Sequence, residues 1–169
     1  RTVDSWKALL TLADEGFITV PGVSNFKAHQ LQMLYDETGV WPQVNQIQCS
    51  PALARDELRE FMSERGIVAQ AWHPTGRKEG LLADPVILRI ARKYGKSPTQ
   101  IALRWSVQQG IGVVPKSAHS GRQLENADLF DFAFDDDDME ALAGLDRGER
   151  AARRGDARHR RDHPGRAGP

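Results

Sequence analysis

The segment VVPKSAHSGRQLEN, residues 113–126, places positive charges where a short apolar run gives way to a polar, helix-forming one. Lys116 and Ser117 directly follow the apolar residues, and Arg122 comes five residues later. Lysine is a compact point charge and arginine a planar fork, and both bind phosphate well. The segment therefore predicts a strand, a loop suited to an anionic ligand and a helix, although cations near a helix start are also commonly only solvated.

The same alternation of strand and helix runs along most of the chain. Short apolar runs predict strands at residues 17–23, 43–48, 67–72 and 111–115. Segments with helical spacing of apolar residues predict helices at 4–14, 28–37, 56–65, 84–94, from 97 onward, 122–129 and 136–145. Strands separated by amphipathic helices indicate βαβ units and a parallel sheet. This pattern alone leaves open a piece of a (β/α) barrel or an open doubly wound sheet.

Polar and aromatic residues follow each predicted strand where it ends. They are Ser24 and Asn25, then Asn45, Gln46 and Gln48, then Trp72 and His73, and finally Lys116 and Ser117. A single Ser-Asn pair after a strand is usually a helix cap, but four consecutive strands ending this way are not explained by caps. Parallel α/β folds place their ligand sites at the carboxyl ends of the strands. We therefore predict a ligand site at this edge of the sheet.

Five motifs occur in order: Gly22–Phe26, Val44–Ile47, Ala71–Gly76, Ile101–Trp105, and Val114–Ser117 with the polar residues that follow it. In these motifs, over about residues 3–149, the chain resembles the C-terminal half of the aldo/keto reductase family. The resemblance implies an α/β fold that is the C-terminal half of a TIM (β/α)8 barrel, with about four parallel strands and covering helices. It also implies NADPH as cofactor and hydride transfer to a carbonyl substrate, an aldehyde or a ketone.

The resemblance assigns one group of residues to the nicotinamide end of the cofactor. Ser24, Asn25 and Gln46 are expected to hydrogen-bond the nicotinamide carboxamide. Trp72 stands where the family places an aromatic residue that stacks on the nicotinamide ring. A flat face there leaves one side of the ring free to offer its hydride.

A second group is assigned to the opposite end of NADPH. Lys116 and Ser117 are expected to hold the adenosine 2′-phosphate, and Arg122 to contact that phosphate or stack on the adenine. Glu125 and Asn126 are expected to meet the adenine edge. A 2′-phosphate needs cations, which NAD would not require, so the residue chemistry agrees with NADPH.

The resemblance matches none of the family's catalytic tetrad of Asp, Tyr, Lys and His to this chain. Without a proton donor aligned to the carbonyl oxygen, little reduction is expected. Two hypotheses follow: the cofactor half of an NADPH-dependent reductase, or a non-catalytic nucleotide-binding remnant of a truncated or frameshifted gene. No metal site is predicted, because the acidic run Asp135–Asp138 precedes a helix that such residues cap.

Charge and composition limit the partners and the compartment. The formal net charge is zero over 169 residues, but residues 150–169 contain seven arginines and two aspartates. The rest of the chain is therefore acidic overall, and no nucleic acid partner is predicted. The single Cys49 excludes an internal disulfide and fits a reducing compartment. No signal peptide or membrane-length apolar run is found, so the sequence predicts a cytoplasmic protein without a membrane partner.

The domain prediction is a partial barrel over residues 1–149 and an Arg-rich, disordered tail over 150–169. The tail has no apolar periodicity and reads as a frameshifted GC-rich sequence would, so we expect a fragment or an interrupted gene product. Four strands do not close a barrel. We therefore expect a complementing half, or self-association through the open sheet edges.

Overall fold

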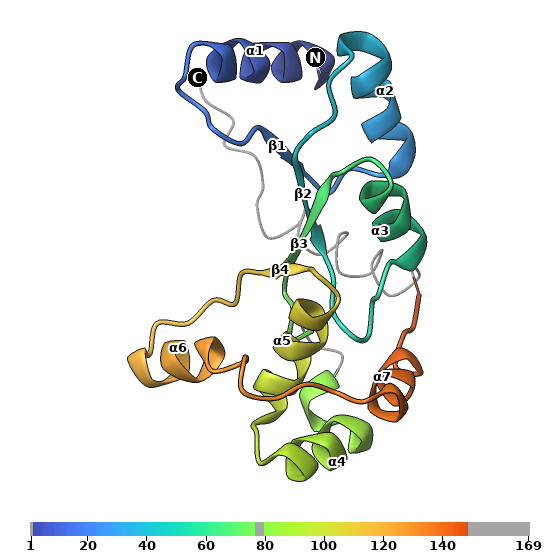
Figure 1. The fold of residues 1–169 in the computed structure, drawn as a ribbon, viewed down its shortest axis with the longest axis vertical. Coiled ribbons are helices and arrows are strands. Elements are labelled where there is room, and N and C mark those ends of the chain that lie inside the picture. The colour runs from blue at the N-terminus through green and yellow to red at the C-terminus, as the bar shows by residue number, and fades with distance from the viewer. Residues whose placement is uncertain (1, 77–79, 149–169) are drawn as a thin grey trace, which may run out of the picture.

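The computed structural model describes residues 2–76 and 80–148, and it contains one four-stranded sheet in the order β1-β2-β3-β4 (Figure 1). The predicted tail at 150–169 lies outside the described residues. All three strand pairs are parallel. The prediction of four parallel strands is confirmed, and the strands are β1 (Gly22–Ser24), β2 (Val44–Gln48), β3 (Val68–Trp72) and β4 (Gly112–Val113).

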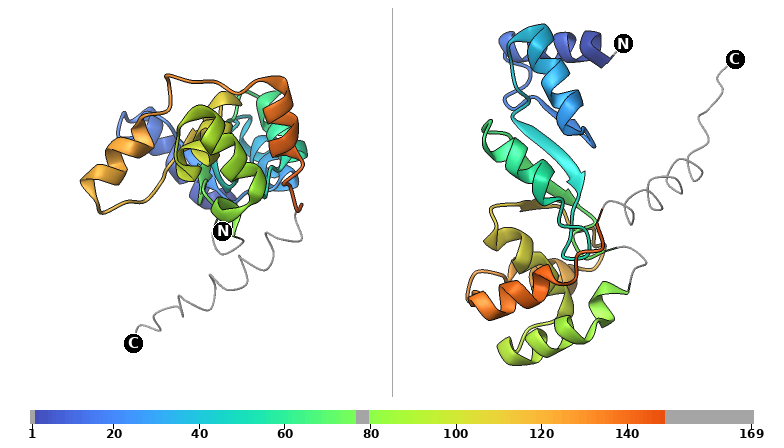
Figure 2. Two further views of the ribbon diagram at one scale, coloured as in Figure 1. Left: turned by 90° about the horizontal axis from the view of Figure 1, so that it is seen from below. Right: turned by 90° about the vertical axis from the view of Figure 1, so that its right-hand side faces the viewer.

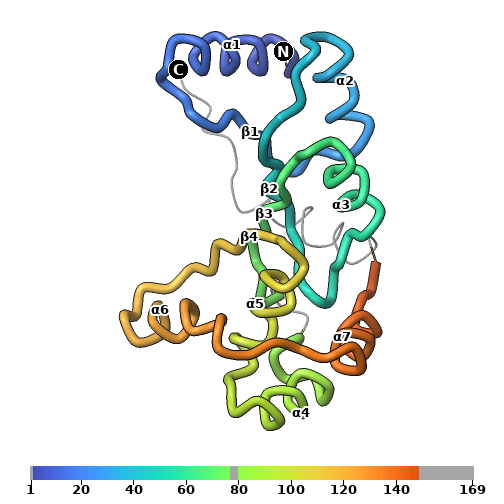
Figure 3. Tube along the Cα trace, in the orientation of Figure 1, coloured from blue at the N-terminus to red at the C-terminus, as the bar shows by residue number. Residues whose placement is uncertain are grey.

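Helices occupy most of the chain between and after the strands. The α-helices are α1 (Thr2–Asp14), α2 (Ala28–Thr38), α3 (Asp56–Ser63), α4 (Pro85–Tyr94), α5 (Pro98–Gln108), α6 (Ser120–Ala127) and α7 (Asp136–Ala143), with a short 3-10 helix at Leu81–Ala83. Helices α1 and α2 lie near β1, whereas α4 to α7 lie beyond β4 (Figure 1). Figure 2 shows α4 and α7 side by side. After β4 the chain runs outward to α6 and returns past α5 to α7 (Figure 3).

Local capping residues set several of these helix ends. Asp84 accepts a hydrogen bond from the backbone N–H of Val86 and opens α4 with a proline in its first turn. Ser97 and Gln100 form a reciprocal capping box at the start of α5. Gly39 ends α2 in the left-handed conformation, with its N–H donating to the backbone oxygen of Tyr35.

The first predicted strand is wrong over most of its length. The backbone N–H groups of Phe17 and Ile18 donate to the carbonyl of Leu12 at the end of α1, at 2.9 and 3.3 Å. They are therefore not available to a sheet ladder, and the Phe17 side chain is 78% exposed. The fourth strand is also shorter than residues 111–115, although the N–H of Val114 still donates to Ala71 across the edge.

The helices cover one face of the sheet through two hydrophobic clusters. The larger cluster joins β2 and β3 to α4, α5 and α7 and includes Ile47, Ala71, Ile90, Trp105 and Leu142. The smaller cluster, Leu31, Met62 and Ile67, joins α2 and α3 to the start of β3. Successive side chains on a strand point to opposite faces. The alternate residues of β2 and β3 therefore point away from these helices.

Candidate functional site

A row of polar side chains crosses the sheet face that the helices leave open. Ser24 pairs in register with Gln46, and Gln46 pairs with Gln70. Residues paired in a parallel sheet share a face. Ile47 and Ala71, the next residues along β2 and β3, are fully buried against the helices. The polar row therefore lies on the opposite face.

The four residues predicted for the nicotinamide end are joined by a directed series of hydrogen bonds. The indole Nε1 of Trp72 donates to Asn25 Oδ1 at 2.8 Å. Asn25 Nδ2 donates to Ser24 Oγ at 3.2 Å, and Ser24 Oγ donates to the backbone oxygen of Gln46 at 3.1 Å. The structure thus gathers residues from β2, β3 and the end of β1 into one cluster of hydrogen-bond donors and acceptors, the amide cluster.

The loop that carries Asn25 is clamped by a buried asparagine on β2. Asn45 is fully buried, donates through Nδ2 to the backbone oxygen of Phe26 at 2.8 Å, and accepts from its N–H at 3.3 Å. Asn25 itself has a φ of 59°, a left-handed conformation that asparagine tolerates better than most residues. The sequence marked Asn45 only as a polar strand-end residue, and its clamping role was missed.

Gln70 is a second residue that the sequence analysis missed. Its Oε1 accepts a hydrogen bond of 2.6 Å from Gln46 Nε2. The available signal was a glutamine inside the otherwise apolar strand β3. The strand prediction treated it as sheet structure and assigned it no partner.

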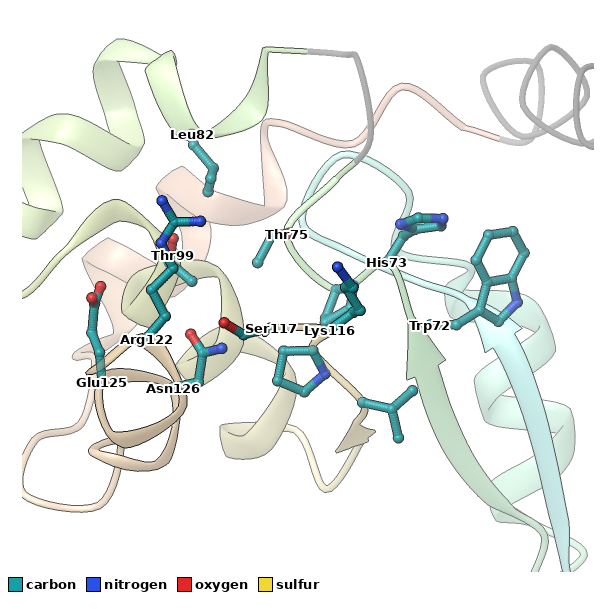
Figure 4. Close-up of a pocket in the computed structure, with 13 residues that line it drawn as sticks. Trp72, His73, Thr75, Leu82, Thr99, Lys116, Ser117, Arg122, Glu125 and Asn126 are labelled. Carbon is teal, nitrogen blue, oxygen red and sulfur yellow. The ribbon is translucent and has the colours of Figure 1, made fainter. Parts of the chain in front are cut away.

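A groove of about 760 Å³ extends from Trp72 to α6 (Figure 4). In Figure 4, Trp72 lies at one side of the view, Arg122 and Glu125 lie at the other, and Lys116 and Ser117 lie between them. All five residues predicted for the phosphate and adenine end line this groove, including Asn126. Lining residues that the sequence analysis gave no role are Pro74, Thr75, Leu82 and Thr99, together with His73, which it mentioned only as a strand-end residue.

The cationic end of the groove is exposed and held by local contacts. Lys116 and Arg122 are exposed, and neither is ion-paired with the residues that the structure describes. The hydroxyl of Ser117 accepts from the N–H of His119 at 3.2 Å, which shapes the loop before α6. The Glu125 carboxylate accepts a hydrogen bond from Ser97 Oγ, so it also fastens α6 to α5.

Other ionisable groups have structural roles. Asp135 caps α7 by accepting from the N–H of Asp138 at 2.9 Å, as predicted. Asp138 is 1% exposed and accepts hydrogen bonds from Lys93 and Tyr94. Burial raises the pKa of the Cys49 thiol to about 11, so it is held neutral. Within residues 2–76 and 80–148, no cluster of His, Cys, Asp or Glu has a metal-binding arrangement, and no helix is long and apolar enough to cross a membrane.

Comparison with known sequences gives a match to one family. The profile of the Aldo/keto reductase family matches residues 2–147. The chain is 43% identical over 148 residues to 2,5-diketo-D-gluconic acid reductase B of Corynebacterium sp. (strain SHS752001), covering 88% of this chain and 53% of that protein. It is 40% identical over 149 residues to the methylglyoxal reductase DkgA of Escherichia coli (strain K12), with 88% and 54% covered.

Solved structures agree with this match. A crystal structure of a Gox0644 mutant in complex with NADPH superposes with a TM-score of 0.83 and 41% identity, covering 86% of this chain and 53% of that one. An aldo/keto reductase from Brucella melitensis gives a TM-score of 0.81 and 42% identity, with 85% and 55% covered. The chain therefore spans about half the length of the curated relatives and solved structures it matches.

Proposed function

Because this chain belongs to the aldo/keto reductase family, we propose that it supplies the NADPH-binding half of a carbonyl reductase. The observation that carries the proposal is the continuity of one groove from Trp72, beside the amide cluster, to the cations of the β4–α6 loop. A dinucleotide in an extended pose has a carboxamide at one end and, in NADPH, a phosphate at the other. One end of the groove lies beside hydrogen-bonding groups suited to a carboxamide, and the other end carries cations suited to a phosphate.

At the phosphate end, Lys116 and Arg122 would bind the 2′-phosphate, and Ser117 would add a hydroxyl. Both cations lie free of ion pairs within the described part of the chain, so binding a phosphate would break no existing pair. Arg122 lies in the first turn of α6. The helix dipole is positive at this end, so it would also attract the phosphate. NADH lacks this phosphate, so the same site favours NADPH over NADH.

At the other end, Ser24, Asn25 and Gln46 would hydrogen-bond the nicotinamide carboxamide. The indole of Trp72, fixed by its hydrogen bond to Asn25, would stack on the ring and leave the opposite ring face to the substrate. The cofactor, when bound, supplies the hydride for carbonyl reduction. The names of two relatives, a diketo-acid reductase and a methylglyoxal reductase, favour a small carbonyl compound as substrate.

We further propose that this chain alone binds NADPH without oxidising it. No residue of the chain matches the family's tetrad, and a hydride acceptor needs an aligned proton donor. Turnover would require a complementing half that carries the tetrad and pairs with the sheet edges at β1 and β4. Val68 is 53% and Val114 42% exposed beside the open face, which is consistent with a surface that a partner covers.

A fluorescence titration with NADPH, followed by an NADPH-oxidation assay with methylglyoxal, tests both parts of the proposal. We expect saturable binding, weaker binding of NADH and no oxidation above the protein-free rate. Sedimentation analysis of the same sample reports whether copies associate. A chain that unfolds cooperatively but does not bind NADPH would refute the cofactor assignment, and turnover by the monomer would refute the need for a partner.

A further inference from the structure

The side chain of Gln70 reaches Gln46 across the open face of the sheet, beside the groove that begins at Trp72, and neither glutamine lines that groove. The two amides are joined by a hydrogen bond of 2.6 Å, with Gln46 Nε2 as donor and Gln70 Oε1 as acceptor. A glutamine amide has a donor end and an acceptor end of almost equal size. Which end it offers to a ligand is therefore decided by the partner that holds the other end.

The neighbouring cluster has its polarity fixed independently. An indole N–H only donates, so Trp72 fixes Oδ1 of Asn25 as an acceptor and turns Nδ2 toward Ser24. One Asn25 N–H is then left for a ligand oxygen. One N–H of Gln46 Nε2 is engaged by Gln70, which directs the NH2 group toward Gln70 and leaves Gln46 Oε1 to accept from a ligand N–H. A carboxamide has one oxygen and one NH2 group, and it complements this pair.

We propose that Gln70 is a positioning residue that orients Gln46, so that Gln46 Oε1 accepts from the NH2 group of the nicotinamide carboxamide. This inference rests on the proposed function, since it assumes that the carboxamide binds at Ser24, Asn25 and Gln46. Its consequence is a preference for a carboxamide over an acetyl group on the pyridine ring, because an acetyl group has no N–H to donate.

The test is calorimetric titration of the whole chain with three ligands: NADP+, its 3-acetylpyridine analogue and 2′,5′-ADP. Gln70→Met keeps the length of the side chain but removes the strong acceptor. We expect NADP+ to bind about fivefold more weakly to this variant, the size of one lost hydrogen bond. The acetylpyridine analogue and 2′,5′-ADP should change by less than about twofold, so the carboxamide preference falls.

Two further variants test whether Gln70 acts by orienting Gln46 or whether loss of any side-chain hydrogen bond weakens ligand binding. Gln70→Glu carries a carboxylate that can only accept, so it should preserve the preference for NADP+ over the acetylpyridine analogue. Gln32→Met is a matched control, because it removes a 2.8 Å side-chain hydrogen bond to Asp36 on α2. This control should leave all three affinities unchanged.

The outcomes are distinguishable from failure of the proposed function. If the unaltered chain binds neither NADP+ nor 2′,5′-ADP, the proposed function and this inference both fail. If it binds NADP+ but Gln70→Met keeps the full carboxamide preference, only the role of Gln70 is refuted. Equal weakening of all three ligands by Gln70→Met would show a merely structural role and would also overturn the inference.

Discussion

Replacing Lys116 by methionine tests the phosphate end of the proposed cofactor groove. Two unit charges 4 Å apart attract by about 1 kcal/mol in bulk water and about 4 kcal/mol near a protein surface of lower dielectric. Lys116 is exposed, so solvent screening places its contribution toward the lower value. We take about 1.4 kcal/mol, which corresponds to about a tenfold change in affinity.

The expected result is therefore a differential one. Lys116→Met should weaken NADPH binding about tenfold and leave NADH binding within about twofold, because NADH has no 2′-phosphate to contact. The difference should shrink as salt rises, since the interaction is exposed to the solvent. Fluorescence titrations of both cofactors at low and high ionic strength provide the measurement.

The matched control is Lys7→Met. Lys7 is an exposed lysine on α1, 4.0 Å from the carboxylate of Glu37, and it does not line the groove. It changes the net charge of the chain by the same amount as Lys116→Met. Equal losses of NADPH and NADH affinity in Lys116→Met, or equal effects of the two substitutions, would refute a 2′-phosphate contact at Lys116.

Three further predictions concern stability. A Cβ atom at Gly22 would lie 2.9 Å from the backbone oxygen of Val44, so Gly22→Ala should lower the free energy of unfolding by about 2 kcal/mol in urea titration. Asp138→Asn removes the charge of a buried, hydrogen-bonded carboxylate, and it should cost about 2 kcal/mol in the same assay. Lys93 holds the pKa of Asp135 below its ordinary value of 3.8 through a hydrogen bond. That stabilisation should persist above about pH 4 and be lost as the pH falls further, measured by unfolding at a series of pH values.

Each stability prediction has a control on the same chain. Gly121→Ala places a methyl group where no neighbouring atom lies within 4 Å, so it should not destabilise the protein. Asp137→Asn changes an exposed carboxylate of the same acidic run and should have little effect. Lys93→Met should reduce the acid-dependent loss. Equal effects of either substitution and its control, or an unchanged acid dependence in Lys93→Met, would contradict the corresponding assignment.

Local chemistry explains why most of the fold could be predicted from the sequence. The ends of α2, α4 and α5 depend on residues within a few positions of the cap, such as Gly39, Asp84 and Ser97. Apolar spacing likewise predicts β2 and β3 to within one residue. The prediction failed at Phe17, where an apolar run forms no strand because its backbone N–H groups are used by the end of α1.

The candidate site could be predicted only where its residues directly follow the ends of strands. Ser24, Asn25 and Trp72 are identified by their positions after strands, and the structure brings them together. Asn45 and Gln70 depend on what lies across the sheet. Their partners, Phe26 in the loop after β1 and Gln46 on β2, lie 19 and 24 residues away along the chain, and no local pattern identifies them.

The loop that carries Asn25 and the helix that carries Arg122 are fastened to different hydrophobic clusters. The clamp residue Asn45 also lies 3.5 Å from the sulfur of Met62, which belongs to the smaller cluster. At the cationic end, Gln100 Nε2 donates to the backbone oxygen of Asp128 at 2.8 Å and so joins α5 to the residue after α6. Helix α5 packs in the larger cluster through Trp105.

The two ends of the groove would differ in how specifically they recognise a nicotinamide cofactor. As proposed, the 2′-phosphate site would require helix α5 and the loop before α6, and any adenosine 2′-phosphate would satisfy it. The directed hydrogen bonds from Trp72 to Asn25 and from Gln46 to Gln70 require β1, β2 and β3 in register. Under the proposed function, the cluster of Trp72, Asn25, Ser24 and Gln46, rather than Lys116, would distinguish a nicotinamide site from a general nucleotide site.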